Sequence, residues 1–113
     1  MKDEIKKYLL DIKISIESIN EFIGEKRNFF TYQDNKQLRR AIERELSIIG
    51  ECVNKISKLD NTIKIDNTKY IIGIRNIIIH GYDKVDDIIV WGVISKYLPI
   101  LYEEIKLMIP ENF

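Results

Sequence analysis

Three stretches of the chain carry apolar residues at intervals of three and four positions, which is the spacing of one face of an α-helix. They cover residues 5–23, 38–56 and 89–105. Amphipathic helices of this length must bury their apolar faces against one another, so the pattern restricts the chain to a helical bundle. The residues that form the three stripes are Ile5, Tyr8, Leu9, Ile12, Ile16, Ile19 and Ile23; Leu38, Ile42, Ile49, Val53 and Ile56; and Ile89, Trp91, Ile94, Leu98, Leu101 and Ile105.

Capping and helix-breaking residues set the expected limits of these helices. Gly24 predicts the end of the first helix, and Asp34 is a candidate cap for the second. Asp86 or Asp87 begins the last helix, in which Pro99 predicts a kink because proline lacks a backbone N–H donor. The polar and aromatic stretch between the first two helices is expected to be a connection.

Residues 68–80 form the segment whose structure is hardest to predict. The segment is apolar nearly all round, and its six isoleucines also make it the best strand candidate in the chain. We expect a helix ending at Gly81, because a lone strand would have no partner. A helix that is apolar all round must be covered on every side, at the centre of a bundle or at a subunit interface. The predicted fold is a single all-α domain over 1–113, an antiparallel up-and-down bundle of four or five helices.

The composition narrows the possible functions. Eighteen basic and eighteen acidic residues among 113 give a formal net charge of zero. A protein that binds nucleic acid through its overall charge would be basic, so any such contact must come from a local patch. A single cysteine, Cys52, excludes an internal disulfide and indicates a reducing compartment. With no leader pattern and no membrane-spanning apolar run, we expect a soluble cytoplasmic protein with Cys52 buried.

The polar residues inside the apolar third segment are the strongest candidates for chemistry. Arg75, Asn76 and His80 would each be costly to bury without a partner, so they either satisfy one another or line a cleft. His80 is the only histidine, and histidine is the side chain best suited to proton transfer near neutral pH. An arginine nearby supplies the positive charge that an anionic transition state requires. Together these residues indicate chemistry on a phosphate.

Helical geometry limits how these residues can cooperate. Asn76 and His80 are four positions apart, so they share a face and can hydrogen-bond. Arg75 and His80 are five positions apart, which places them roughly 140° apart around a regular helix. Either the helix frays at Gly81 and swings His80 round, or a second subunit brings its own copies. We favour the second subunit, because an apolar helix with a polar edge suits a two-fold interface.

The same residues carry a resemblance to a known family. The order of these residues resembles the R-N-x-x-x-H-x-Y motif of the HepT-like toxins in the HEPN superfamily. The flanking segments resemble the neighbouring helices of that family, so the resemblance covers nearly the whole chain. The resemblance implies a homodimer of helical bundles whose two motifs face one cleft. The matching residues are Arg75-Asn76, His80-Gly81-Tyr82, Val85-Asp86 and Val90-Trp91, preceded by Arg44-Glu45-Leu46 and Ile49-Gly50-Glu51.

The resemblance also implies an activity and a partner. Such proteins cut RNA without a metal ion or a cofactor, by attack of a ribose 2′-hydroxyl on the adjacent phosphate. His80 would be the general acid or base, Arg75 would stabilise the transition state, and Asn76 would orient His80 or a phosphate oxygen. A minimal nucleotidyltransferase, the antitoxin of a type II toxin–antitoxin pair, would add AMP to Tyr82. The added bulk and negative charge would block the substrate phosphate.

Other interpretations of these residues stay open. Arg75, Asn76 and His80 could instead form a polar cluster that ties the third helix to its neighbours, and Tyr82 could be a packing aromatic. The acidic pair at the start of the last helix is explained better by the helix dipole than by a metal. The alternative function is a non-catalytic helical protein that binds and regulates a nucleotidyltransferase, which the zero net charge favours.

Two further groups of side chains have both a functional and a structural interpretation. A basic run on the second helix could face RNA or could be a solvated helix face with neighbouring glutamates. The aromatic residues of the connection could stack single-stranded bases or could fold onto the bundle. We expect the structural interpretation for both groups, and packing roles for Trp91 and Tyr97. The basic run is Arg39, Arg40 and Arg44, and the aromatics are Phe29, Phe30 and Tyr32.

Overall fold

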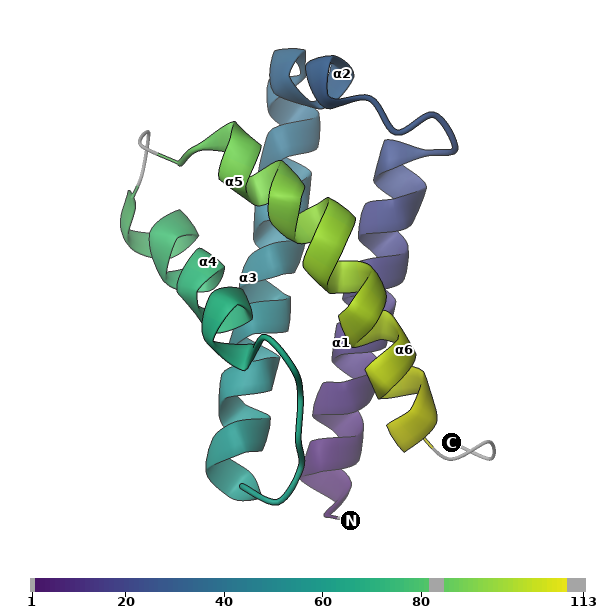
Figure 1. Ribbon diagram of the computed structural model, residues 1–113, viewed down its shortest axis with the longest axis vertical. Helices are drawn as coiled ribbons and strands as arrows, with labels where there is room; N and C mark the ends of the chain where they lie inside the picture. Colours follow the sequence, from purple (N-terminus) through teal and green to yellow (C-terminus); the bar gives the residue numbers. More distant parts are fainter. Residues whose placement is uncertain (1, 82–84, 110–113) are drawn as a thin grey trace.

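The computed structural model describes residues 2–81 and 85–109, and within these ranges the chain is built of helices and loops (Figure 1). The all-α helical bundle expected from the sequence is confirmed. Helices α1 and α3 run antiparallel, α4 packs against α3 at an angle, and the last helical segment crosses α3 and α1 obliquely (Figure 1). The elements are α1 (Asp3–Ile23), α2 (Phe29–Asp34), α3 (Lys36–Leu59), α4 (Thr68–Gly81), α5 (Asp87–Gly92), η2 (Val93–Tyr97) and α6 (Leu98–Met108).

The core forms where the predicted apolar stripes of α1, α3 and the last segment face one another. These side chains are buried because an amphipathic helix gains most by removing its apolar stripe from water. None of the helices in the described ranges is long and apolar enough to cross a bilayer. The buried side chains of the three helical segments are Ile5, Leu9, Ile12, Ile16 and Ile19; Ile42, Leu46, Ile49, Val53 and Ile56; and Val90, Val93, Ile94, Leu98, Leu101 and Ile105. Leu46, Val90 and Val93 were not in the predicted stripes, and the prediction of Ile89 as a core residue was wrong, since its side chain is 51% exposed.

Most of the helix ends lie where the sequence predicts them. Gly24 ends α1 with a φ of 78°, a backbone conformation that favours glycine. The side chain of Asp86 caps α5 by accepting hydrogen bonds from two backbone N–H groups. The cap of α3 is Asn35, so the prediction of Asp34 was wrong by one residue. Asp34 is instead the last residue of α2, a short helix in the stretch expected to be a connection.

The interruption expected at Pro99 occurs in the turn before it. Val93–Tyr97 is a π-helical turn, and the backbone N–H of Leu98 donates to the carbonyl of Val93, five residues back. Pro99 then lies in the first turn of α6, where a missing N–H leaves no hydrogen bond unmade. The wide turn therefore lets α5 and α6 continue as one helical segment through the proline.

Helix α4 lies on the surface of the bundle, with one side packed against α3 and the other side open. Only Ile71 and Ile74 of α4 are buried, whereas Ile77 and Ile79 are 42% and 39% exposed. The predicted position at the centre of the bundle was wrong, because α1, α3 and the last segment form most of the core and α4 adds only Ile71 and Ile74 to it. The other expectation for this helix, a subunit interface, remains a prediction.

The approach of α4 to α3 depends on a buried glycine in the middle of α3. A Cβ at Gly50 would lie 2.5 Å from the Cβ of Arg75 and 3.1 Å from the carbonyl oxygen of Ile71. The distance to the Cβ of Arg75 is too short for two non-bonded carbon atoms, so a side chain at Gly50 would force the two helices apart. Gly50 therefore fixes both the packing of α4 and the position of Arg75.

We predict that Gly50→Ala lowers the free energy of unfolding by about 1–3 kcal/mol, the usual cost of overpacking. The matched control is Gly73→Ala in α4, because a Cβ there meets nothing within 4 Å. Replacing this helical glycine is expected to be neutral or to stabilise by about 0.5–1 kcal/mol. Urea unfolding followed by circular dichroism measures both changes. Equal stability of the two variants would show that the helices do not meet at Gly50.

Candidate active site

Arg75 lies on the flank of α4 that faces α3. Its stem passes over Gly50, and its guanidinium Nη1 donates to Oδ1 of Asn76 at 3.3 Å. The Nε atom is buried and has no hydrogen-bond partner among the described residues. The stem is therefore packed against α3, and only the terminal nitrogens of the guanidinium, not the buried Nε, can donate to a ligand.

His80 lies in the last turn of α4 and is exposed. It follows Gly73 by seven residues and Ile77 by three, so it shares their face of the helix. Within residues 2–81 and 85–109 its ring makes no hydrogen bond. Helix α4 stays regular through Gly81, so the fraying that could have turned His80 towards Arg75 is not seen. One copy of the chain keeps Arg75 and His80 on different flanks of the helix.

Asn76 is exposed and is the hydrogen-bond partner of Arg75, not of His80. The polar-cluster interpretation required these three side chains to tie α4 to its neighbours. The bond that Arg75 makes stays on its own helix, and Asn76 and His80 face solvent. The structure brings together Arg75 and Asn76 but not His80. Tyr82 lies outside the described residues.

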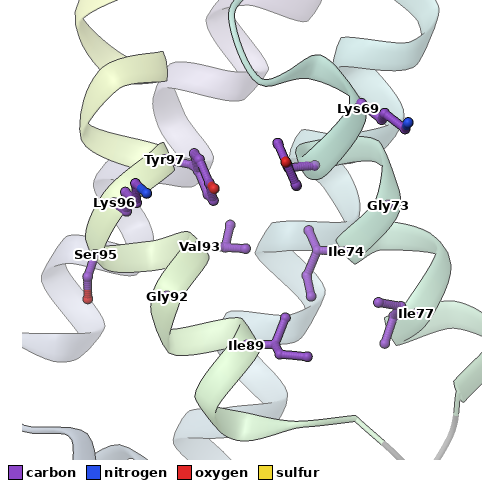
Figure 2. Close-up of a pocket in the computed structure, with 11 residues that line it drawn as sticks. Lys69, Gly73, Ile74, Ile77, Ile89, Gly92, Val93, Ser95, Lys96 and Tyr97 are labelled. Atoms are coloured by element: carbon purple, nitrogen blue, oxygen red, sulfur yellow. The ribbon is translucent and has the colours of Figure 1, made fainter.

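An apolar pocket of about 620 Å³ opens between α4 and the α5–η2 segment (Figure 2). The side chains of Ile74 and Ile77 from α4 and of Val93 from η2 point into it (Figure 2). Tyr70 and Tyr97 stack beside them, with ring centroids 5.2 Å apart. This apolar pocket is on the flank of α4 that carries His80.

A second hollow, the polar pocket, has a volume of about 580 Å³ and lies between the first half of α3, the end of α4 and the start of α5. It adjoins the motif, because a Cβ on Gly81 would be 3.9 Å from Cγ2 of Val85, a lining residue. The polar pocket is lined by Lys36, Arg39, Arg40, Glu43, Ile78, Val85 and Asp87.

The basic run of α3 divides between two environments. Arg39 and Arg40 line the polar pocket, whereas Arg44 does not. The Nε atom of Arg39 lies 4.0 Å from Oδ1 of Asp87, so its ion pair crosses to α5 instead of following the helix surface. Burial raises the pKa of the Glu43 carboxyl and the charge of Asp87 adds to the effect, whereas the charge of Arg40 opposes it. The basic run is therefore not a uniformly solvated helix face, because two of its arginines line the polar pocket and one of them pairs with α5.

The aromatic residues of α2 mostly fold onto the bundle, as expected. Tyr32 is buried, and its ring centroid lies 5.3 Å from that of Trp91. The ring of Trp91 also packs edge-on against Phe29, with the centroids 6.0 Å apart. Phe30 differs, since it is 67% exposed. The packing role predicted for Trp91 is confirmed.

Cys52 and the acidic pair have structural roles. Cys52 is buried, and burial raises the pKa of its thiol to about 11, which leaves little of the nucleophilic thiolate at neutral pH. Asp86 is the cap of α5, and Asp87 pairs with Arg39. Across the described ranges, no three His, Cys, Asp or Glu side chains come together as metal ligands would.

Comparison with known proteins gives the site its context. The model of the HepT-like ribonuclease family matches residues 12–108. This chain belongs to that family. A candidate RNase of Methanocaldococcus jannaschii, MJ1380, is 32% identical over 109 residues, which cover 95% of this chain and 98% of the relative.

Two further relatives have similar assignments. The candidate RNase MJ0125 of the same archaeon is 31% identical over 97% of this chain and 95% of its own length. The candidate RNase TTE0752 of Caldanaerobacter subterraneus is 34% identical over 76% of this chain and 80% of its own length. No solved structure matches the chain. This member of the HepT-like ribonuclease family thus carries the arginine, asparagine and histidine of the motif on an exposed helix.

Two parts of this region escaped the sequence analysis. Gly50 was noted only as part of a resemblance, although a glycine inside a long amphipathic helix is itself a sign of a close approach. Lys36 and Glu43 were not recognised as neighbours of the motif. Their positions near Arg39 and Arg40 on one helix face were visible in the sequence, but the contribution of α4 and α5 was not.

Proposed function

We propose that this HepT-like ribonuclease is a metal-independent endoribonuclease toxin of a type II toxin–antitoxin pair, and that it works as a homodimer. The observation that carries the proposal is the position of Arg75 and His80. Both lie in the second half of an apolar helix that is open on one side, and His80 faces solvent. A lone histidine and an anchored arginine supply proton transfer and positive charge, which phosphate chemistry requires.

The proposed reaction uses the RNA's own 2′-hydroxyl as the nucleophile. The 2′-oxygen forms a bond to the adjacent phosphorus as the bond from phosphorus to the 5′-oxygen breaks. The proton of the 2′-hydroxyl is removed by one general base, and the leaving 5′-oxygen receives a proton from a general acid. His80 takes one of these roles. The products are a 2′,3′-cyclic phosphate and a 5′-hydroxyl.

Arg75 would stabilise the negative charge on the pentavalent phosphorus. Its Nη1 bonds to Asn76 and its stem packs over Gly50, so these two contacts restrict the guanidinium before RNA binds. This preorganisation is what makes charge stabilisation effective. Asn76 thereby positions Arg75. The side-chain amide of Asn76 could also donate a hydrogen bond to a phosphate oxygen of the RNA.

The geometry of a single chain supports the homodimer. Arg75 and His80 lie on different flanks of a regular α4, so a second copy is the simplest source of the missing group. Ile77 and Ile79 on α4 and Ile88 and Ile89 on α5 are exposed, and they offer apolar surface that a second copy would cover. Each subunit would then contribute one Arg75 and one His80 to a shared cleft.

Regulation by a minimal nucleotidyltransferase completes the proposal. Tyr82 follows His80 by two residues, so AMP added to its hydroxyl would lie next to the cleft. The adenylate would occupy the position of the substrate and would repel its phosphate. The zero net charge favours a second candidate, a non-catalytic partner of such an enzyme.

Cleavage by the purified chain tests the enzymatic proposal. We expect the wild type to fragment single-stranded RNA in the presence of a chelator and to leave cyclic phosphate ends. His80→Ala and Arg75→Gln should each lower the rate by about 100-fold or more, with unchanged circular dichroism. Intact RNA with the wild type would favour the non-catalytic partner instead.

Mixing two inactive variants tests the shared cleft. We expect Arg75→Gln and His80→Ala proteins, each inactive alone, to regain activity after they are refolded together. Half of the dimers would then contain one complete pair, formed between subunits, so about a quarter of the wild-type rate is expected. If both groups act within one subunit, the mixture will stay as inactive as its components.

Modification at Tyr82 has a separate test. Coexpression with a nucleotidyltransferase from the same toxin–antitoxin class should add one adenylate to the wild type, seen by mass spectrometry, and should abolish cleavage. Tyr82→Phe lacks the acceptor oxygen, so it should stay unmodified and active under the same conditions. Adenylate found on Tyr82→Phe would place the modification elsewhere.

A further inference from the structure

The polar pocket stands beside the proposed cleavage site and has no role in the cleavage chemistry itself. We propose that it binds one nucleotide of the RNA, with Lys36 and Arg40 holding a phosphate and Glu43 accepting hydrogen bonds from the base, which favours guanine. This inference rests on the proposed function, because it assigns part of the substrate. It adds a source of base selectivity that Arg75 and His80 do not provide.

The pocket has the size and the position of a substrate subsite. Its volume of about 580 Å³ falls within the roughly 300–1,000 Å³ of sites that bind small molecules. Val85 forms part of its wall and also neighbours Gly81, the residue after His80. Ile78, from the same end of α4, is a second apolar wall. A nucleotide seated here would be close along the RNA backbone to a phosphate at the motif.

Two of the three cations in the pocket are available to a ligand. Arg39 is occupied, because it pairs with Asp87 and donates to the carbonyl of Gln33. In the part of the chain that the structure describes, neither Lys36 nor Arg40 forms an ion pair or a side-chain hydrogen bond. They are four positions apart and share a face of α3. One phosphate between them would be held by two charges.

Glu43 gives the pocket a preference among bases. It is half-buried, and within the described ranges no side-chain or backbone donor bonds to its carboxylate. An ionised carboxylate is an acceptor with two oxygens, so it matches two adjacent donors. Guanine presents such a pair at N1–H and N2–H₂. Adenine and cytosine place an acceptor nitrogen beside the amine, and uracil places its single N–H between two carbonyls. The carboxylate therefore selects guanine.

Binding without turnover tests the phosphate contact. The full-length His80→Ala protein and short single-stranded RNAs with one guanine or adenine would be compared by fluorescence anisotropy. Adding Lys36→Ala and Arg40→Ala should weaken binding of both RNAs about tenfold and reduce the salt slope by about one to two. The control adds Lys7→Ala and Lys58→Ala, which remove the same charge from exposed positions elsewhere and should change affinity little.

Glu43→Gln in the same His80→Ala protein tests the base contact. It should reduce the preference for guanine over adenine about tenfold, the usual value of one good paired contact to a base, and leave the adenine RNA bound as before. Glu51→Gln, exposed on the same helix, should keep the preference. Three results would overturn the inference. They are a protein that binds no RNA, a Lys7→Ala/Lys58→Ala control that weakens binding as much as Lys36→Ala/Arg40→Ala does, and a Glu43→Gln variant that keeps the full preference for guanine. Intact RNA with the wild type, together with the predicted binding changes, would refute cleavage but support the subsite.

Discussion

The close contact between α3 and α4 at Gly50 determines the arrangement of the whole functional region. The absence of a side chain lets α4 settle against α3 with the stem of Arg75 directly over the glycine. The same contact sets how α4 is rotated about its axis. Arg75 therefore lies on the α3 flank, and His80 and the open apolar surface lie on the others. The angle between Arg75 and His80 comes from their spacing along the helix, and the rotation of α4 decides that Arg75 is the one that faces α3.

The bundle itself could be predicted from the sequence, because helix spacing and capping are local properties. The stripe from Ile5 to Ile23 and the cap at Asp86 required no knowledge of distant contacts. The position of α4 could not be predicted in this way. Its apolar composition shows that surface must be covered, but not whether the same chain or another copy covers it. Helix α2 was missed because six residues are too short for a periodic pattern, and its start depends on the side chain of Asn28.

The candidate site was predictable in its chemistry and less so in its geometry. His80 and Arg75 were identified because polar side chains in an apolar helix are costly to bury unless they have a partner or line a cleft. The partner of Asn76 was not predicted, because helical spacing indicated His80, four residues on, whereas the structure has Arg75 as the donor. The polar pocket joins side chains from three helices and the loop before α5, so only the fold could reveal it. Although the chain has no net charge, this pocket holds two cations, Lys36 and Arg40, that have no ion-pair partner among residues 2–81 and 85–109.

The aromatic cluster of α2 and α5 has a practical consequence. Trp91 is the only tryptophan of the chain, and it packs against both Phe29 and Tyr32 from the helix that begins next to the polar pocket. Its fluorescence therefore comes from one known position, a few residues from Asp87. The emission spectrum of the unmodified protein is a built-in optical reporter, without any attached dye, of events at the end of the molecule where α2, α3 and α5 meet.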